Sequence, residues 1–80
     1  NYPNPFNPRT DVRYLVPGVS DVKIAVYDVL GREVAVLVNE RKQPGSYKAV
    51  FDASGLASGV YLYRMTAGSF VESQKMLLLK

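Results

Sequence analysis

Few side chains in this sequence could carry out nucleophilic or acid–base catalysis. The 80 residues include no cysteine and no histidine, so the thiol nucleophile and the commonest general base are missing. Two hydroxyls, Ser54 and Ser58, lie in the small-residue stretch 52–59, where serine commonly stabilises turns. Only a lysine or a carboxylate could activate them. We therefore interpret both serines as turn residues.

Acidic side chains could bind calcium or act in pairs on a glycosidic bond. The seven Asp and Glu fall at the ends of predicted strands or in turns, which favours neither paired-carboxylate hydrolysis nor a helix–loop–helix calcium site. Gly55 and Gly59 precede a predicted strand instead of a helix, so they do not form a phosphate loop. We expect no enzymatic activity, no metal and no cofactor. The aspartates weighed as calcium ligands are Asp11, Asp21, Asp28 and Asp52.

The composition is that of a single small globular domain. The chain is 48% hydrophobic and 21% charged, with a net charge of +3. Its ten Lys and Arg are scattered, and only Arg41 and Lys42 are adjacent, which indicates solvated strand faces and not a nucleic-acid surface. No apolar run approaches the ~20 residues that span a bilayer. The chain has no signal peptide and does not begin with Met, so we expect a fragment cut from the far end of a larger precursor. We also expect a monomer.

The element that organises the chain is the stretch Asp52–Thr66, where two clusters of turn residues lead into a strand. Tyr61 follows Gly59 by two residues at the start of this strand. The placement is typical of a tyrosine corner, in which the hydroxyl bonds to upstream backbone and fixes a crossover between two sheets. Leu56 would hold the crossover against the core. The alternative is that Tyr61 is an ordinary core aromatic; in either case we expect the strand to be central, because both of its faces are largely apolar.

Alternating apolar and polar residues predict five further strands, over 10–16, 21–28, 32–38, 46–51 and 70–79. Each of the first four presents three apolar side chains on one face. These sets are Val12, Tyr14 and Val16; Val22, Ile24 and Val26; Val34, Val36 and Val38; and Tyr47, Ala49 and Phe51.

The connections are predicted from turn residues. Residues 28–32 form a short hairpin with Gly31 in the left-handed conformation, and residues 67–69 form a tight turn. Residues 39–45 are expected to be an exposed loop. The last strand is expected to contain a bulge that switches its facing. Because an unpaired edge reading Met76–Leu79 would invite aggregation, it should lie inside a sheet or pair with a partner.

These elements predict an all-β fold, an antiparallel Ig-like β-sandwich of six to seven strands. Three prolines make residues 1–9 a stiff lead-in packed on the domain through Tyr2 or Phe6, and residues 10–80 form the domain itself. A seventh strand could come from the first eight residues or from the 39–45 loop. The predicted core is Val22, Ile24, Val26, Val34, Val36, Phe51, Leu56, Tyr61, Tyr63 and Met65.

Five sequence blocks, in order, resemble a known family. The blocks are NYPNPFNPRTDVRY, VYDVLGREV, PGSYKAVFD, LASGVYLYRM and the terminal KMLLLK. Together they resemble the C-terminal sorting domain of the type IX secretion system, an Ig-like domain at the ends of secreted proteins of Bacteroidetes. They are also similar to the Ig-like domain of flagellar hook-capping proteins. Position 51, often Trp in such sequences, is Phe here and still fills a core site.

The resemblance implies a passenger tag that directs export of a preceding cargo domain to the cell surface or the medium. It implies two partners, the secretion machinery of the outer membrane and a sortase-like peptidase that often removes the tag. The family's terminal signal ends here in a single basic residue, not a pair. The family's motifs fall on Pro3, Asn4 and Pro5, on Gly59 and Tyr61, and on Lys75, Met76, Leu77, Leu78, Leu79 and Lys80.

A second non-catalytic reading is an Ig-like module that binds carbohydrate or another component of the cell surface. Tyr2, Tyr27 or Tyr63 would supply the aromatic contact. Carbohydrate platforms favour exposed, coplanar aromatics and often use Trp, which is absent here. A single tyrosine on a strand more often packs half-buried.

Overall fold

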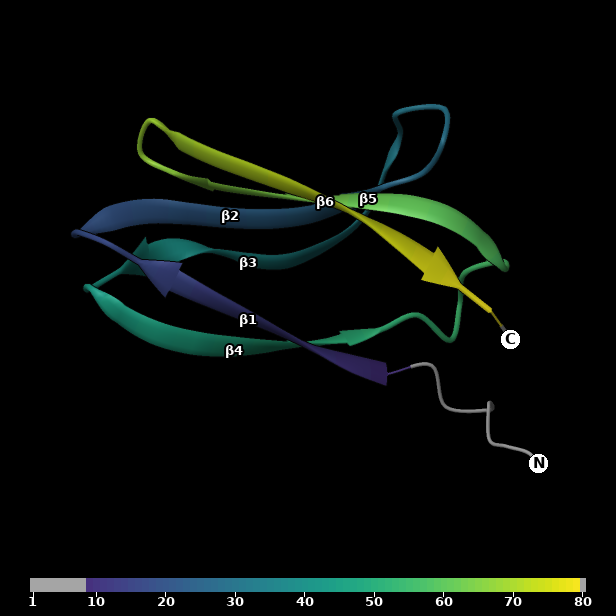
Figure 1. Cartoon of the computed structure of the whole chain (residues 1–80), viewed down its shortest axis with the longest axis horizontal. Helices are drawn as coiled ribbons and strands as arrows, with labels where there is room; N and C mark the ends of the chain where they lie inside the picture. The colour runs from purple at the N-terminus through teal and green to yellow at the C-terminus, as the bar shows by residue number, and fades with distance from the viewer. Residues whose placement is uncertain (1–8, 80) are drawn as a thin grey trace.

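The computed structural model describes residues 9–79, which form six antiparallel strands and contain no helix. The strands make two sheets, one in the order β1–β4 and one in the order β3–β2–β5–β6. Figure 1 shows the sheets as two layers, with β1 and β4 in the smaller one. This is the predicted all-β sandwich and is consistent with an Ig-like fold. The strands are β1 (Arg9–Val16), β2 (Ser20–Tyr27), β3 (Glu33–Lys42), β4 (Gly45–Asp52), β5 (Gly59–Ala67) and β6 (Phe70–Leu78).

Two clusters of buried apolar side chains fill the space between the sheets. The first surrounds Ile24, which has no exposed surface, and the second surrounds Val26 and Phe51. The described residues include no buried charged side chain. Of the predicted core, Val22, Ile24, Val26, Phe51, Tyr61 and Met65 are buried, and Val34, Leu56 and Tyr63 are half-buried against the clusters.

The prediction for Val36 is wrong, because β3 does not alternate regularly. Val36 is 46% exposed. Consecutive residues Ile24 and Ala25 of β2 pair with Val38 and Val36, so Leu37 is an extra residue in β3, and a second register shift occurs at Val26/Tyr27. Each extra residue reverses the facing of the strand. Leu37 consequently packs against the core in the place that a regular strand would give to Val36.

The predicted 39–45 loop is wrong over most of its length. Residues 39–42 continue β3 and pair with residues 20–23 of β2. Polar side chains are tolerated there because β3 is an edge strand, where they can remain in water. Two ion pairs accompany the extension, Arg41–Asp21 at 3.3 Å and Lys42–Glu40 at 3.3 Å. The extension adds to β3 and supplies no seventh strand.

Further expectations concern the positions of the last two strands, β5 and β6, and the regularity of β6. β5 lies between β2 and β6, so its predicted central position is confirmed. The predicted bulge in β6 is wrong, because its pairing with β5 runs without a register shift from Ala67↔Phe70 to Gly59↔Leu78. Within the described residues β6 is an edge strand, so of the two alternatives for Met76–Leu79 the interior position is excluded and pairing with a partner stays a prediction.

The predicted turns at Gly31 and Gly68 are confirmed, with φ of 82° and 62°. In the first turn the Asp28 carboxylate accepts hydrogen bonds from the backbone N–H of Leu30 at 2.9 Å and of Arg32 at 3.0 Å. The Arg32 side chain adds a contact of 2.7 Å to the same carboxylate. Gly68 is the first central residue of a two-residue β5–β6 turn, and a positive φ at that position is the mark of a type II′ hairpin.

The buried position of Ile24 generates a stability prediction. Ile24→Ala should lower the free energy of unfolding by about 2–5 kcal/mol, because it removes buried methyl groups and leaves a cavity. Urea denaturation of the purified domain measures the change. Val50→Ala is the matched control: Val50 is 52% exposed, and its loss should change stability by no more than about 0.5 kcal/mol. Equal midpoints for the two variants would contradict the core described above.

Candidate functional site

Tyr61 forms the predicted tyrosine corner. Its hydroxyl donates a hydrogen bond of 2.7 Å to the carbonyl of Ala57, four residues upstream in the β4–β5 connection. The ring is buried in the second core cluster, where Leu56 packs as predicted. The Leu56 N–H donates to the carbonyl of Ala53 at 2.9 Å and tightens the same crossover. The corner fixes the point at which the chain passes from the small sheet to the large one.

Gly59 is required by its backbone conformation. Its φ of 158° is one that L side chains rarely adopt. Space is not the constraint, since a Cβ would meet the Tyr61 ring at an ordinary 4.0 Å. The Gly-x-Tyr motif thus combines a backbone conformation that suits glycine with the tyrosine ring beside it.

A second corner of the same form occurs at the start of β4. Tyr47 donates from its hydroxyl to the carbonyl of Gln43 at 2.7 Å, again four residues upstream, and Gly45 has a φ of 152°. The Tyr47 ring stacks on Tyr14 with centroids 5.5 Å apart, and the Lys42 ammonium lies 4.8 Å from its centre. Sequence reasoning missed this corner. The signal was present, because Gly-x-Tyr occurs at 45–47 and again at 59–61.

The terminal half of β6 lies directly beside the first corner. Tyr61 pairs with Met76, and Gly59 pairs with Leu78. Met76 and Leu78 are half-buried against the second cluster. Leu77 and Leu79 remain 66% and 70% exposed. Strand pairing therefore unites the motif around Gly59 and the terminal motif from Lys75 to Leu79.

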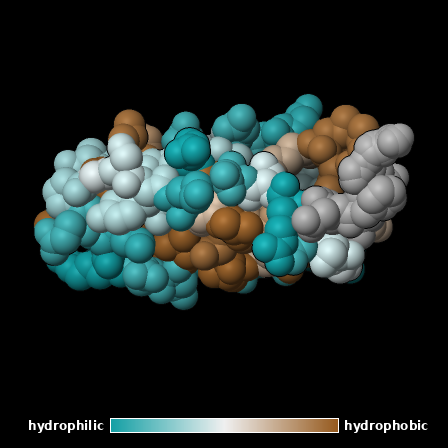
Figure 2. Space-filling model, turned by 90° about the horizontal axis from the view of Figure 1, so that it is seen from below, coloured by the Kyte–Doolittle hydropathy of each residue, from teal (hydrophilic) through white to brown (hydrophobic). Residues whose placement is uncertain are grey.

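A groove with a volume of about 400 Å³ opens at this end of the sandwich. It lies between the start of β1 and the end of β6, at the right of Figure 1. Figure 2 shows apolar surface at the same end of the molecule. The groove thus has residues of the small sheet on one side and the end of β6 on the other. Its lining residues are Arg9, Thr10, Phe51, Ala53, Tyr61 and 76–79.

A comparison with protein families shows which family this chain belongs to. The family described as the secretion system C-terminal sorting domain matches residues 1–79 of the chain. The chain belongs to that family. Comparisons with curated proteins and with solved structures gave no match. Domains of this family are the tails of type IX secretion, generally non-catalytic, and mark proteins exported through the outer membrane to the cell surface or the medium.

Within this sorting domain, the motif residues have unequal access to solvent. Tyr61 is 8% exposed, so its main contribution is to the fold. Lys75 is exposed and forms no ion pair within residues 9–79. Pro3, Asn4, Pro5 and Lys80 lie outside the described residues, as do Tyr2, Phe6 and the proposed packing of the lead-in. The exposed part of the described motifs is therefore the outer side of β6.

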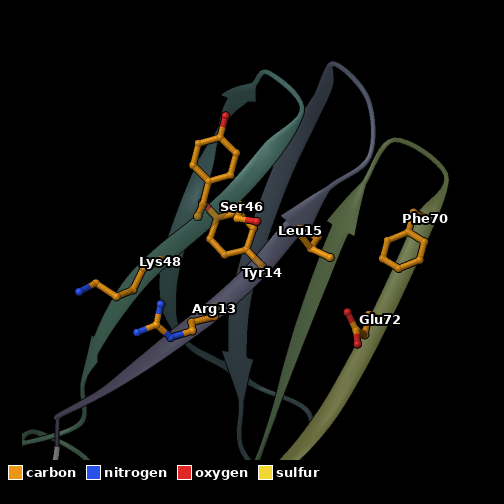
Figure 3. A pocket seen from close by; sticks show the side chains of 8 residues that line it. Arg13, Tyr14, Leu15, Ser46, Lys48, Phe70 and Glu72 are labelled. Atoms are coloured by element: carbon orange, nitrogen blue, oxygen red, sulfur yellow. The ribbon is translucent and has the colours of Figure 1, made fainter.

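A second, wider groove of the sorting domain has a volume of about 660 Å³. Figure 3 shows Arg13 and Lys48 on one side of it and Phe70 and Glu72 of β6 on the other, with the Tyr14 ring at its floor. Burial raises the pKa of Tyr14, with smaller effects from nearby charges. Ser46 and Lys48 both line the groove, but no hydrogen bond joins them among the described contacts. The Tyr14 and Tyr47 rings stack on each other instead of lying side by side in one plane.

The described tyrosines proposed for carbohydrate binding are both engaged within the large sheet. The Arg64 guanidinium lies 5.3 Å from the centre of the Tyr27 ring. Tyr63 is half-buried and donates from its hydroxyl to Gln74 at 2.9 Å, and burial, followed by the charge of Glu72, raises its pKa. Neither ring stands free as a stacking platform.

The four aspartates weighed as calcium ligands each have a separate basic partner. The ion pairs are Asp11–Lys48 at 3.9 Å, Asp21–Arg41 at 3.3 Å, Asp28–Arg32 at 2.7 Å and Asp52–Arg9 at 3.4 Å. Over residues 9–79 no three acidic side chains gather to hold a metal ion. That part of the chain also contains no helix able to cross a membrane. Each of these four aspartates is thus paired with a lysine or arginine.

Asp52 fixes the beginning of the crossover that ends at Tyr61. Its carboxylate accepts a hydrogen bond from the Ser54 N–H at 3.0 Å. The N–H and the hydroxyl of Ser54 hold the pKa of Asp52 below its usual 3.8; burial opposes this shift, and Arg9 adds to it. The carboxylate is therefore ionised at any pH near neutrality.

The two corners predict unequal effects of losing a hydroxyl. Tyr61→Phe should lower the free energy of unfolding by about 1 kcal/mol or more, because it leaves a part-buried carbonyl without its donor. Tyr47→Phe is the matched control and should cost less, because its bond is exposed and water can replace the hydroxyl. Urea midpoints at unchanged slope measure both changes. A Tyr61→Phe midpoint equal to that of the unmodified domain would mean that Tyr61 only packs.

The lowered pKa of Asp52 predicts the direction of an acid effect. Its ionised form stabilises the fold above the pKa of the unfolded chain, about 3.9, and this contribution is lost as pH falls through the lower folded pKa. NMR titration of the Asp52 carboxyl should give a midpoint below 3.8. Ser54→Ala keeps the N–H donor and removes the hydroxyl, so it should raise that midpoint part of the way. A midpoint at or above 3.8 in the unmodified domain would refute the assignment.

Proposed function

We propose that this domain is a non-catalytic export signal that directs a cargo domain on its N-terminal side across the outer membrane by type IX secretion. The observation that carries the proposal is the family match over residues 1–79. The partners are the outer-membrane secretion machinery and a sortase-like peptidase that removes the signal. The peptidase acts on the N-terminal side, where the proline-rich stretch separates cargo from sandwich.

The two ends of the domain have different tasks in this proposal. Pro3, Asn4 and Pro5 belong to the accessible joint with the cargo, and Lys75–Lys80 is the segment presented to the machinery. The exposure of Leu77 and Leu79 supports the second assignment, because large apolar side chains left in water commonly mark a protein interaction site. Gly59 and Tyr61 support recognition indirectly, by holding β5 and hence β6 in place.

Fusion to a reporter tests the proposal in a host with a working type IX system. Residues 1–80 should direct the reporter to the medium or the cell surface, and deletion of residues 75–80 should reduce export at least tenfold. Because that deletion also removes half of β6, the double variant Leu77→Ser/Leu79→Ser should be tested beside it. Val36→Ser/Val50→Ser, also exposed, is its matched control and should export normally.

Two outcomes would count against the proposal. Export that survives both the deletion and the double substitution would remove the role of the terminal segment. Failure of the intact domain to direct export, together with measurable glycan binding by the isolated domain, would favour the surface-binding module instead.

A further inference from the structure

The outer edge of β6 has fewer features that protect against strand addition than the other described sheet edges, because its only charged side chains are Glu72 and Lys75. Natural edge strands are commonly protected by bulges, proline or charges. β3 has two register shifts, and β1 and β4 join their exposed charges in the ion pairs Arg9–Asp52 and Lys48–Asp11. β6 has no register shift, no proline and no ion pair within the described part of the chain. It presents a regular edge of nine residues.

The β5–β6 hairpin determines which backbone groups this edge presents. In a two-residue hairpin the pair that closes the turn exchanges backbone hydrogen bonds, and such pairs then alternate along the ladder. Ala67↔Phe70 closes this turn. The even-numbered residues of β6 therefore bond to β5. The odd-numbered ones direct their N–H and C=O groups away from the sheet; they are Val71, Ser73, Lys75 and Leu77.

The same odd-numbered residues place their side chains on the outer face of the large sheet. Tyr61 is buried in the core and pairs with Met76, so the even positions of β6 face inward and the odd ones outward. On that outer face Leu77 lies opposite Val60, which is 41% exposed. The odd-numbered residues of β6 thus combine backbone groups that do not bond to β5, apolar side chains toward the end of the strand, and the ammonium of Lys75.

We infer that the outer edge of β6 binds an extended segment of a partner protein by strand addition, with apolar residues opposite Leu77 and Leu79 and an acidic residue near Lys75. The inference rests on the proposed function, because the partner is a component of the export machinery. Main-chain hydrogen bonds supply affinity in this mode, and alternate side chains supply specificity. The domain need not unfold to bind, because within residues 9–79 β6 is paired to β5 on one side only.

A second copy of the domain fits this edge less well. A symmetric antiparallel pair that keeps both inner faces on the same side joins residues of the same parity. Glu72 therefore cannot lie opposite Lys75 of another copy. In the pairing with complete overlap Lys75 faces Ser73, so each cation lacks an acid. A different protein can supply the carboxylate.

The test removes one backbone N–H that points away from the sheet and leaves the hydrogen bonds between β5 and β6 intact. Ser73→Pro deletes an N–H that β5 does not use, and proline is tolerated at an edge when its nitrogen faces solvent. Ser73→Ala keeps the N–H and is the matched control. Each variant of residues 1–80 is fused to the same reporter in a type IX-competent host. Ser73→Pro should reduce export at least tenfold while the urea midpoint of its purified domain stays near that of Ser73→Ala, which should export normally.

A cross-linking experiment decides the case in which Ser73→Pro does not fold. A photoreactive amino acid replaces Leu77 on the edge or, as a control, Val50 on the small sheet, which is also exposed. Position 77 should cross-link to a protein of the outer-membrane fraction, and position 50 should not. Cross-links from 77 only to a second copy, or none, would overturn the inference.

The outcomes separate this inference from the proposed function. If the unmodified fusion is not exported, the proposed function fails and strand addition fails with it. If the unmodified fusion and a folded Ser73→Pro variant are both exported, strand addition alone is wrong and the sorting function stands.

Discussion

The hydrogen bond from the Tyr61 hydroxyl to the Ala57 carbonyl fixes the crossover on which the sandwich depends. A chain of 80 residues buries a small core, so the connections that pass between its sheets add to the stability that the core provides. Here Gly59 adopts a positive φ at the start of β5, and the Tyr61 ring beside it also belongs to the core. One motif thus links a local turn to the packing of β5, which in turn carries β6.

Tyr47 repeats this solution at the β3–β4 connection, but closer to solvent. Its ring packs on Tyr14, so the small sheet is braced at both ends of β4, by Tyr47 at the start and by the Asp52 turn at the finish. A sheet of two strands has little stability by itself. The two connections compensate by fixing both ends of β4.

How much the sequence predicts depends on whether the deciding forces are local. Alternation in β1, β2 and β4, the left-handed Gly31 and the corner at Tyr61 follow from neighbouring residues, and all were predicted. The facing of Val36 was not, because three valines at period two give no sign of the register shift that places Leu37 inside. For β6 the sequence left two alternatives open, an interior strand or an edge that pairs with a partner. Apolar content did not decide between them, because strand order depends on pairings between distant residues. For the site, the adjacency of Gly59 and Leu78 appears only once β5 and β6 are paired.

The two-residue turn at Gly68–Ser69 has a consequence for how this domain can vary. Because the ladder from Ala67↔Phe70 to Gly59↔Leu78 contains no bulge, the length of the turn alone sets the phase of β6. A single inserted residue carried along the ladder would exchange the two faces, turning Leu77 toward the core and Met76 toward water. Substitutions along β6 would each change one contact, whereas this insertion would exchange the inward-facing and outward-facing side chains along the whole strand. In a chain like this one, the length of the turn at Gly68–Ser69 therefore decides which side chains β6 exposes as much as the residues of the strand do.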